Sequence, residues 1–482
     1  MTRSAQTRTR SRPLPEQRRA NPLFGTPETR SRRVFFNGFW QPHHEEAVKR
    51  YLSSHDFDAV GLLSHRNFLA DKVDVFVRQH DAYRIYDFRT NPYPHIPPRD
   101  LVERLAPVEV TCLKMMDRHS KNPFKPRQYE FRKRAYLAQL SYAYGLLIEH
   151  RFDRVVFSNL PHNVFDYALH ALCLELGIET SFFYQIQVKD CYLHAIEIDQ
   201  LYAQLQAYLE DHEVAEDVPL PQHLEAEISD RLGEGKPFYM TNKGLSLWQR
   251  IYRKQKRLFR VYTYTQTVFA TRGYLAYLRV PKVNRIPDEP FVYFALHYQP
   301  EATTSPMGGI FVDQYYAVLM IARALPQGYK VVVKEHPRQR FWQRFPENYA
   351  LLANEPKVVF VSQRTSSAEL TRKAAIIAPI TGTVGWEALF QGKPVMLFGE
   401  AFYESLPGVM RVNSQEDIRT MLELYQEGRL ESCRLGDIRR LLYAIHKTGF
   451  TGVLDADYLR NSMTTEEAST STLVEALEQV IS

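Results

Sequence analysis

Cysteine is scarce in this 482-residue chain, and long apolar runs are absent. The four cysteines form no CxxC pair, which excludes the common zinc-ligand spacing and fits a reducing cytoplasm. No run of about 18 apolar residues occurs, so the sequence predicts no transmembrane helix. The polar, Arg-rich beginning has no apolar signal region. We therefore expect a cytoplasmic protein, either free or at the inner face of the cell membrane.

Two nucleotide-binding motifs are also missing. The chain has no GxxxxGK[ST] loop, which excludes a P-loop ATPase site, and no GxGxxG fingerprint, which argues against a dinucleotide. A nucleotide site in this chain must therefore be built in another way.

Positive charge is concentrated at the beginning of the chain. Residues 1–33 hold nine arginines against Glu16 and Glu28, a net charge of +7, whereas the whole chain carries +6. The composition of residues 1–33 predicts a disordered basic arm. The arm is either a solvated tail or a contact for anionic lipid or nucleic acid. Because no nucleic-acid motif accompanies it, we expect no nucleic-acid partner, and contact with an anionic membrane stays open.

Alternating strands and helices predict an α/β unit over residues 34–190. Five short apolar segments read as buried strands: RVFFNGFW, AVGLLS, YRIYDF, RVVFSN and TSFFYQ. HNVFDYALHALCLELG has helical periodicity and a stop signal at Gly177. Such alternation is typical of a mainly parallel sheet covered by helices on both faces.

A helical connector over residues 191–285 separates this unit from a second α/β unit, residues 286–482, which ends in helices. The basic and aromatic segment 245–280 is interpreted as a packed linker helix, because its apolar and basic residues are interleaved; the alternative is a helix on a membrane surface. Two α/β units joined in this way predict a cleft, with ligands bound beyond the carboxyl ends of the strands.

Three strand ends of the second unit carry polar clusters. The clusters are His297, Gln299, Glu301, Thr303 and Thr304; Lys334, Glu335, His336, Pro337 and Arg338; and Thr381, Gly382, Thr383 and Glu387. If they converge, they supply cations and a helix start for phosphate, and carboxylates for ribose. The simpler interpretations are a tight strand-to-helix link at residues 380–399 and a hydrogen-bonded structural histidine at His336.

The matching strand end of the first unit offers a candidate for proton transfer. Asn159 and His162 follow the strand, and Asp166 lies one helical turn after His162, so the two can share a helix face. A His–carboxylate pair suits a general base for a sugar hydroxyl. The alternative is that Asp166 is a first-turn acid favoured by the helix dipole.

These segments resemble a known family. HYQPEATTSPMGG, VKEHP and ITGTVGWEALFQGKPVMLFGEAFYESLPGV are similar to the C-terminal half of bacterial capsule polysaccharide biosynthesis proteins, the group related to Kdo transferases. FSNLPHNVFDYAL resembles a motif in their N-terminal half. The resemblance covers roughly residues 150–190 and 290–412, more specifically in the second region. It implies a GT-B architecture, in which two Rossmann-like domains face a cleft and the C-terminal one binds the donor nucleotide.

The resemblance implies roles for the clusters. An HP dipeptide and a Thr pair would hold a CMP moiety, and a carboxylate on the next helix would take ribose or base. Nucleotide binding is assigned to Lys334, His336, Pro337, Arg338, Thr381, Gly382, Thr383 and Glu387, the donor sugar to His297 and Gln299, and catalysis to His162, Asp166 and Glu301. GT-B sites usually work without metal, and the DAD at 455–457 follows no predicted strand, so we expect neither metal nor cofactor.

The predicted function is a nucleotide-sugar-dependent glycosyltransferase. It would move a sugar, Kdo or a related acidic sugar from a CMP-linked donor, onto a capsule or other surface polysaccharide precursor. Its partners would be the nucleotide-sugar donor and a glycan or glycolipid acceptor. The alternatives are a nucleotide-sugar epimerase, a CDP-linked polyol-phosphate transferase, and a non-catalytic glycan-binding or assembly protein.

Overall fold

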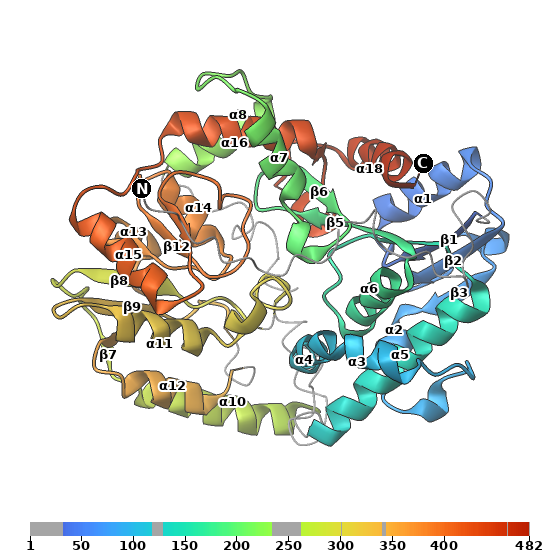
Figure 1. The fold of residues 1–482 in the computed structure, drawn as a ribbon, viewed down its shortest axis with the longest axis horizontal. Helices are drawn as coiled ribbons and strands as arrows, with labels where there is room; N and C mark the ends of the chain where they lie inside the picture. The colour runs from blue at the N-terminus through green and yellow to red at the C-terminus, as the bar shows by residue number, and fades with distance from the viewer. Residues whose placement is uncertain are drawn as a thin grey trace, which may run out of the picture.

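The computed structural model describes residues 32–117, 129–233, 262–299, 301–339, 344–459 and 461–481. Nearly all of the predicted basic arm and part of the basic, aromatic segment that follows residue 244 lie outside these ranges. The described chain forms two α/β halves, each built on a seven-stranded sheet (Figure 1). The predicted class, an α/β protein with two Rossmann-like units in a GT-B-like arrangement, is confirmed.

The first sheet has the order β14-β6-β5-β4-β1-β2-β3. The strands β1 to β5 pair in parallel, whereas β6 and β14 are antiparallel additions at one side. Its strands are β1 (Arg33–Asn37), β2 (Ala59–Ser64), β3 (Val75–Arg78), β4 (Arg154–Phe157), β5 (Glu179–Gln185), β6 (Cys191–Ala195) and β14 (Phe450–Thr451).

The second sheet has the order β13-β12-β11-β8-β9-β10-β7, with every pair parallel. Parallel pairing places all the carboxyl ends on one edge. Its strands are β7 (Lys282–Val283), β8 (Phe291–Ala295), β9 (Lys330–Lys334), β10 (Val358–Val361), β11 (Ile376–Ile377), β12 (Val395–Leu397) and β13 (Val409–Arg411).

Helices cover both sheets and bridge the two halves. In the first half and the connector they are α1 (Pro42–Ser54), α2 (Gln79–Ala82), α3 (Arg99–Arg104), α4 (Ala106–Met115), α5 (Tyr129–His150), α6 (Val164–Leu176), α7 (Ala203–Asp211) and α8 (Gln222–Leu232). In the rest of the chain they are α10 (Tyr262–Arg279), α11 (Gln314–Ala324), α12 (Pro346–Ala353), α13 (Ser367–Lys373), α14 (Thr383–Leu389), α15 (Gln415–Gln426), α16 (Leu435–Thr448), α17 (Ala456–Leu459) and α18 (Glu466–Ile481). As predicted, α6 stops at Gly177, which adopts a left-handed conformation with φ +69°.

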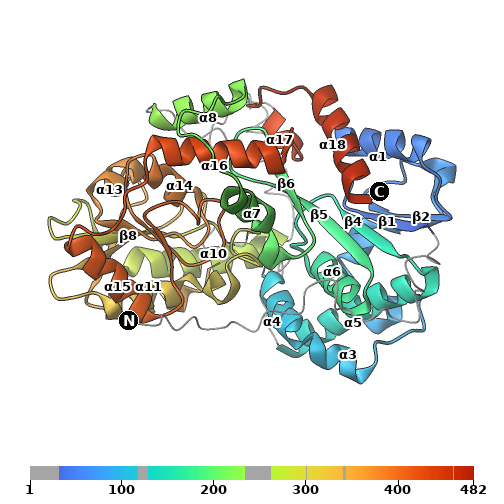
Figure 2. The same ribbon diagram turned by 45° about the horizontal axis from the view of Figure 1, so that its top comes forward.

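The domain boundaries differ from the prediction at two places. The predicted connector contributes β6 to the first sheet and β7 to the second. The end of the chain, assigned to the second unit, returns to the first: β14 pairs with β6, and α18 packs against α1 (Figure 2). The return is driven by burial, because Leu473 and Leu477 of α18 are at most 1% exposed in a core shared with Val48.

One predicted strand is wrong. YRIYDF, residues 83–88, forms turns and the start of a 3₁₀ helix, while the neighbouring β3 was missed. Only Ile85 of the segment is buried, and Tyr83 turns its hydroxyl toward Asp166 at the edge of the first sheet. Among the described helices, none is both long and apolar enough to cross a bilayer.

Candidate functional site

Three strand ends of the second sheet meet around His297. β11, β8 and β9 are adjacent and parallel, so their carboxyl ends share an edge. His297 Nε2 accepts the backbone N–H of Thr381 at 3.3 Å, and the Thr381 hydroxyl donates to the Thr303 carbonyl at 2.6 Å. Gly382 caps α14, and a Cβ there would overlap the His297 ring, so glycine is needed for this approach. The first and third clusters are therefore in contact.

The second cluster makes this edge electropositive. Burial, followed by the charges of His336 and Arg344, lowers the pKa of His297 to about 3. Burial, followed by the charges of Arg338, Arg344 and Lys334, lowers the pKa of His336 to about 4. Both imidazoles are therefore neutral at pH 7. Because Arg344 is paired with Glu335, the field that favours an anion comes from Lys334 and Arg338.

The turn after β9 orients His336 as a hydrogen-bond donor. The backbone N–H of His336 donates to Glu335 Oε1 at 2.7 Å. The His336 Nδ1 atom accepts the backbone N–H of Arg338 at 3.2 Å. Because the ring is neutral and Nδ1 is an acceptor, the ring proton resides on Nε2. Pro337 and Arg338 are exposed, whereas Lys334 is buried and donates to a serine hydroxyl of α13.

A buried ion pair supports the same edge. Arg344 Nε lies 2.9 Å from Glu335 Oε2, and the two side chains are 5% and 0% exposed. Tyr349 donates to the same carboxylate oxygen at 2.5 Å. Arg344 also donates to the His297 carbonyl at 2.9 Å and to Gln299 Oε1 at 3.2 Å. Gln299, which was predicted to contact the donor sugar, thus has its side-chain oxygen bonded within the protein.

Glu387 on α14 is tied to the connector. Arg231 Nη1 of α8 donates to Glu387 Oε1 at 3.2 Å, and its Nε donates to Glu227 Oε1 at 2.7 Å. Trp386 donates to Glu227 Oε1 at 3.1 Å and is fully buried, as expected of a packing residue. Glu387 is 31% exposed, whereas Arg231 is only 5% exposed. The carboxylate therefore still reaches solvent, and its predicted role toward ribose stays a prediction.

Asp166 lies at the carboxyl edge of the first sheet in a polar network. Its Oδ2 accepts from the Tyr83 hydroxyl at 2.6 Å and from Asn163 Nδ2 at 2.9 Å, and its Oδ1 accepts from Asn37 Nδ2 at 3.2 Å. Burial raises the pKa of Asp166 to about 6, although these three donors lower it. A carboxyl group that titrates near neutrality is well suited to proton transfer.

The other two predicted catalytic residues occupy different positions. His162 follows β4, and its Nδ1 donates to the Leu160 carbonyl at 2.6 Å. Glu301 belongs to the second half, is exposed, and accepts from the Thr303 hydroxyl at 3.2 Å. Burial, followed by electrostatic interaction with Tyr458 and Glu301, raises the pKa of Tyr184 in β5. The catalytic roles of His162 and Glu301 stay predictions.

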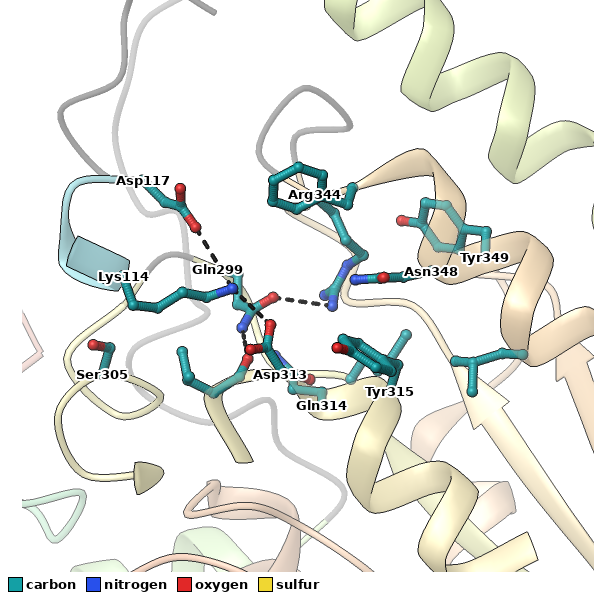
Figure 3. A pocket seen from close by; sticks show the side chains of 14 residues that line it. Lys114, Asp117, Gln299, Ser305, Asp313, Gln314, Tyr315, Arg344, Asn348 and Tyr349 are labelled. Carbon is teal, nitrogen blue, oxygen red and sulfur yellow. Dashed lines mark hydrogen bonds and ion pairs between the residues drawn. The ribbon is translucent and has the colours of Figure 1, made fainter. Parts of the chain in front are cut away.

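A small pocket marks the junction of the two halves (Figure 3). Lys114 of α4, in the first half, extends to the second half, where its Nζ lies 2.6 Å from Asp313 Oδ1. The same Nζ lies 3.7 Å from Asp117 Oδ2 in the first half. Gln299 and Arg344 line the same pocket. The cavity offers about 30 Å³, room for roughly two water molecules. This space is too small for a nucleotide, so a nucleotide would have to bind outside this pocket.

Several site residues escaped the sequence prediction. Lys114, Asp313 and Arg344 belong to no strand-end motif, and isolated charges of this kind give no signal in a single sequence. Arg231 and Glu227 are four residues apart in a predicted helix, and this spacing indicates an ion pair between them. It does not indicate that Arg231 also contacts Glu387. Within the described ranges, no group of three or more His, Cys, Asp or Glu side chains is arranged to hold a metal ion.

Comparisons with known proteins find a family match over part of the chain. Residues 312–431 match the sequence model of a family described as capsule polysaccharide biosynthesis protein. No curated protein matches the chain. Similar solved structures include the KpsC β-Kdo 2,7 transferase of Thermosulfurimonas dismutans, with 13% identity, 70% of this chain and 89% of that chain covered, and a TM-score of 0.31.

Two further similar structures show the same level of likeness. The KpsC β-Kdo 2,4 transferase of Thermosulfurimonas dismutans has 14% identity, covers 60% of this chain and 86% of that chain, and has a TM-score of 0.26. The UDP-GlcNAc 2-epimerase of Neisseria meningitidis has 13% identity, covers 86% of this chain and 99% of that chain, and has a TM-score of 0.26. At such TM-scores these likenesses carry no argument about function.

The family match covers the strand ends that carry His336 and Thr381, and it confirms the resemblance over residues 312–412. Over residues 312–431 this chain is therefore similar to the capsule polysaccharide biosynthesis protein family.

Proposed function

We propose that the protein is a glycosyltransferase that moves a sugar from a nucleotide-linked donor onto a capsule or other surface polysaccharide precursor. The observation that carries the proposal is the electropositive edge of the second sheet. There the cations Lys334 and Arg338 act on His336, and this histidine and His297 are both neutral, beside the start of α14. This edge favours the phosphate of a donor nucleotide. The sugar would be Kdo or a related acidic sugar from a CMP-linked donor.

The first half would supply the base for the acceptor hydroxyl, and the second half would bind the leaving phosphate. The acceptor hydroxyl oxygen attacks the anomeric carbon of the donor sugar, its proton passes to the Asp166 carboxylate, and the bond between that carbon and the phosphate oxygen breaks. The leaving phosphate takes the electron pair. His336 Nε2–H and the cations of the second sheet stabilise the resulting negative charge. Asp166 can act as the base above pH 6, because its pKa is about 6.

Turnover assays would test the proposal directly. The full chain is incubated with CMP-sugars and UDP-sugars and a capsule-type oligosaccharide, and both free nucleotide and extended glycan are measured. A transferase releases nucleotide and extends the glycan in equal amounts. An epimerase keeps the nucleotide on the sugar, and a non-catalytic glycan-binding protein produces neither product.

The donor nucleotide gives a prediction for thermal unfolding. CMP or CDP should raise the melting temperature more than UDP does, since the HP dipeptide His336–Pro337 and the Thr pair resemble a CMP site. At a ligand concentration a hundred times Kd, the free energy of unfolding rises by about 2.7 kcal/mol. Protection by UDP without protection by cytidine nucleotides would show that the CMP assignment is wrong.

Thr383, the first residue of α14, gives a second prediction. Thr383→Val keeps the side-chain shape but removes the hydroxyl, and loss of one hydrogen bond to a charged phosphate costs about 1.5 to 3 kcal/mol. Calorimetric titration with CMP should therefore show affinity about ten- to a hundredfold weaker. Thr420→Val, on the exposed part of α15, is the matched control and should bind normally. If Thr383→Val destabilises the protein while its folded fraction binds CMP normally, residues 380–399 are only a strand-to-helix link.

A further inference from the structure

Carboxylates are missing from a long part of the chain around α10. Residues 235–287 hold twelve lysines and arginines and not one Asp or Glu, although the whole chain has 55 acidic residues. This stretch carries +12 and residues 1–33 carry +7, whereas the total is +6, so the rest of the chain carries −13. Positive charge is thus separated from negative charge along the sequence.

The described part of this stretch exposes large apolar side chains. Tyr274, Leu275 and Leu278 of α10 are 46%, 44% and 52% exposed. At 100° per residue they fall on one side of the helix, and the exposed Arg272 and Arg279 lie next to them on the same side. We name these five residues the α10 face.

The opposite side of α10 is packed. Tyr277 and Val280 are 5% and 4% exposed, and the Tyr277 ring lies 5.4 Å from that of Tyr349 in α12. α10 therefore docks on α12 through one side and turns the α10 face outward. In Figure 1 it runs along the lower edge of the molecule.

We propose that the α10 face docks onto an anionic lipid bilayer. Leu275 and Leu278 would enter the boundary between headgroups and acyl chains, Tyr274 would lie at the headgroup level, and Arg272 and Arg279 would pair with lipid phosphates. The charge complementarity extends along the sequence, because residues 235–287 carry twelve Lys and Arg and no carboxylate, and basic residues next to a helix on the bilayer strengthen its binding to an anionic leaflet. The inference is independent of the proposed transfer reaction.

The test is sedimentation of the full chain with vesicles of phosphatidylcholine and phosphatidylglycerol in equal parts. The wild type should bind these vesicles, bind phosphatidylcholine vesicles more weakly, and be released by salt. Leu275→Glu/Leu278→Glu should lower the partition coefficient at least about tenfold, because burial of each leucine is lost. Both positions are exposed, so thermal unfolding should be unchanged.

The matched control is Ile96→Glu/Val110→Glu. These side chains are 68% and 70% exposed in the first half, and the variant makes the same change of charge away from the α10 face. It should retain most of the binding. Equal loss in both variants would mean that net charge alone attracts the protein, which overturns the proposal. So would a wild type that ignores anionic vesicles, or a dimer in light scattering that only Leu275→Glu/Leu278→Glu dissociates, because a second copy would then cover the face.

Discussion

Asp166→Asn is expected to abolish most sugar transfer while making the protein more stable at neutral pH. As the proposed base, Asp166 removes the proton of the acceptor hydroxyl, and loss of a general base lowers turnover by about a hundred- to ten-thousandfold. Asparagine has nearly the same shape, and its oxygen can still accept from Asn37 or Asn163. The loss should therefore appear in kcat of the transfer assay, with nucleotide affinity unchanged.

The gain in stability follows from the raised pKa. The carboxyl group titrates near its ordinary value of 3.8 when unfolded and near 6 in the folded protein. Between these values the folded state binds more protons, so the free energy of unfolding falls as pH rises from 4 to 6. A shift of about two units corresponds to about 3 kcal/mol at pH 7. Asp166→Asn removes this cost, which chemical denaturation at pH 7 would measure.

The pH–rate profile separates catalysis from structure. In the wild type, kcat/KM should fall about tenfold per pH unit below pH 6, as the Asp166 carboxylate becomes protonated. Asp211→Asn, at an exposed position in α7, is the control and should change neither the profile nor the stability. A stable and fully active Asp166→Asn variant would leave Asp166 as a purely structural member of its network. A destabilised variant would show that its hydrogen bonds outweigh the cost of its buried charge.

The positions of the strand ends were predictable from the sequence, because each buried strand of a parallel sheet is a short apolar run that ends at polar residues. His297, Lys334 and Thr381 each follow a short apolar run bounded by polar residues, and periodicity identifies such runs. The sheet order then brings β11, β8 and β9 together, and the contact between His297 and Thr381 follows. The placement of Asp166 in the first turn of α6 was predictable in the same way.

Contacts across long sequence distances were not predictable. Lys114 meets Asp313 and Arg231 meets Glu387 through the relative placement of the two halves and the connector, which no local pattern encodes. The return of α18 to α1 has the same cause, since an amphipathic helix shows that it needs a partner surface but not which one. Gln299 illustrates the limit most directly: its position at a strand end was foreseen, but its bond to Arg344 was not.

The buried pair of Arg344 and Glu335 should be the most sensitive support of the donor edge. Removing one partner of a buried ion pair leaves an uncompensated charge, and this costs about 3 to 5 kcal/mol. Arg344→Met should therefore lower the free energy of unfolding by that amount, measured by chemical denaturation. The control is the exposed Arg323, which lies 3.8 Å from the partly buried Glu355 in the same half, and Arg323→Met should cost less than about 1 kcal/mol.

A second substitution at Glu335 tests whether the loss comes from the charge. In Glu335→Gln/Arg344→Met neither side chain is charged, and the glutamine oxygen can still accept from either the Tyr349 hydroxyl or the His336 N–H. The double variant should be more stable than Arg344→Met alone, because no buried carboxylate is left unpaired. The single variant Glu335→Gln is measured as well. If the free energy of unfolding lost by the double variant equals the sum of the losses in Glu335→Gln and Arg344→Met, the two side chains are not coupled. Arg344 then acts mainly through its bonds to the His297 carbonyl and Gln299.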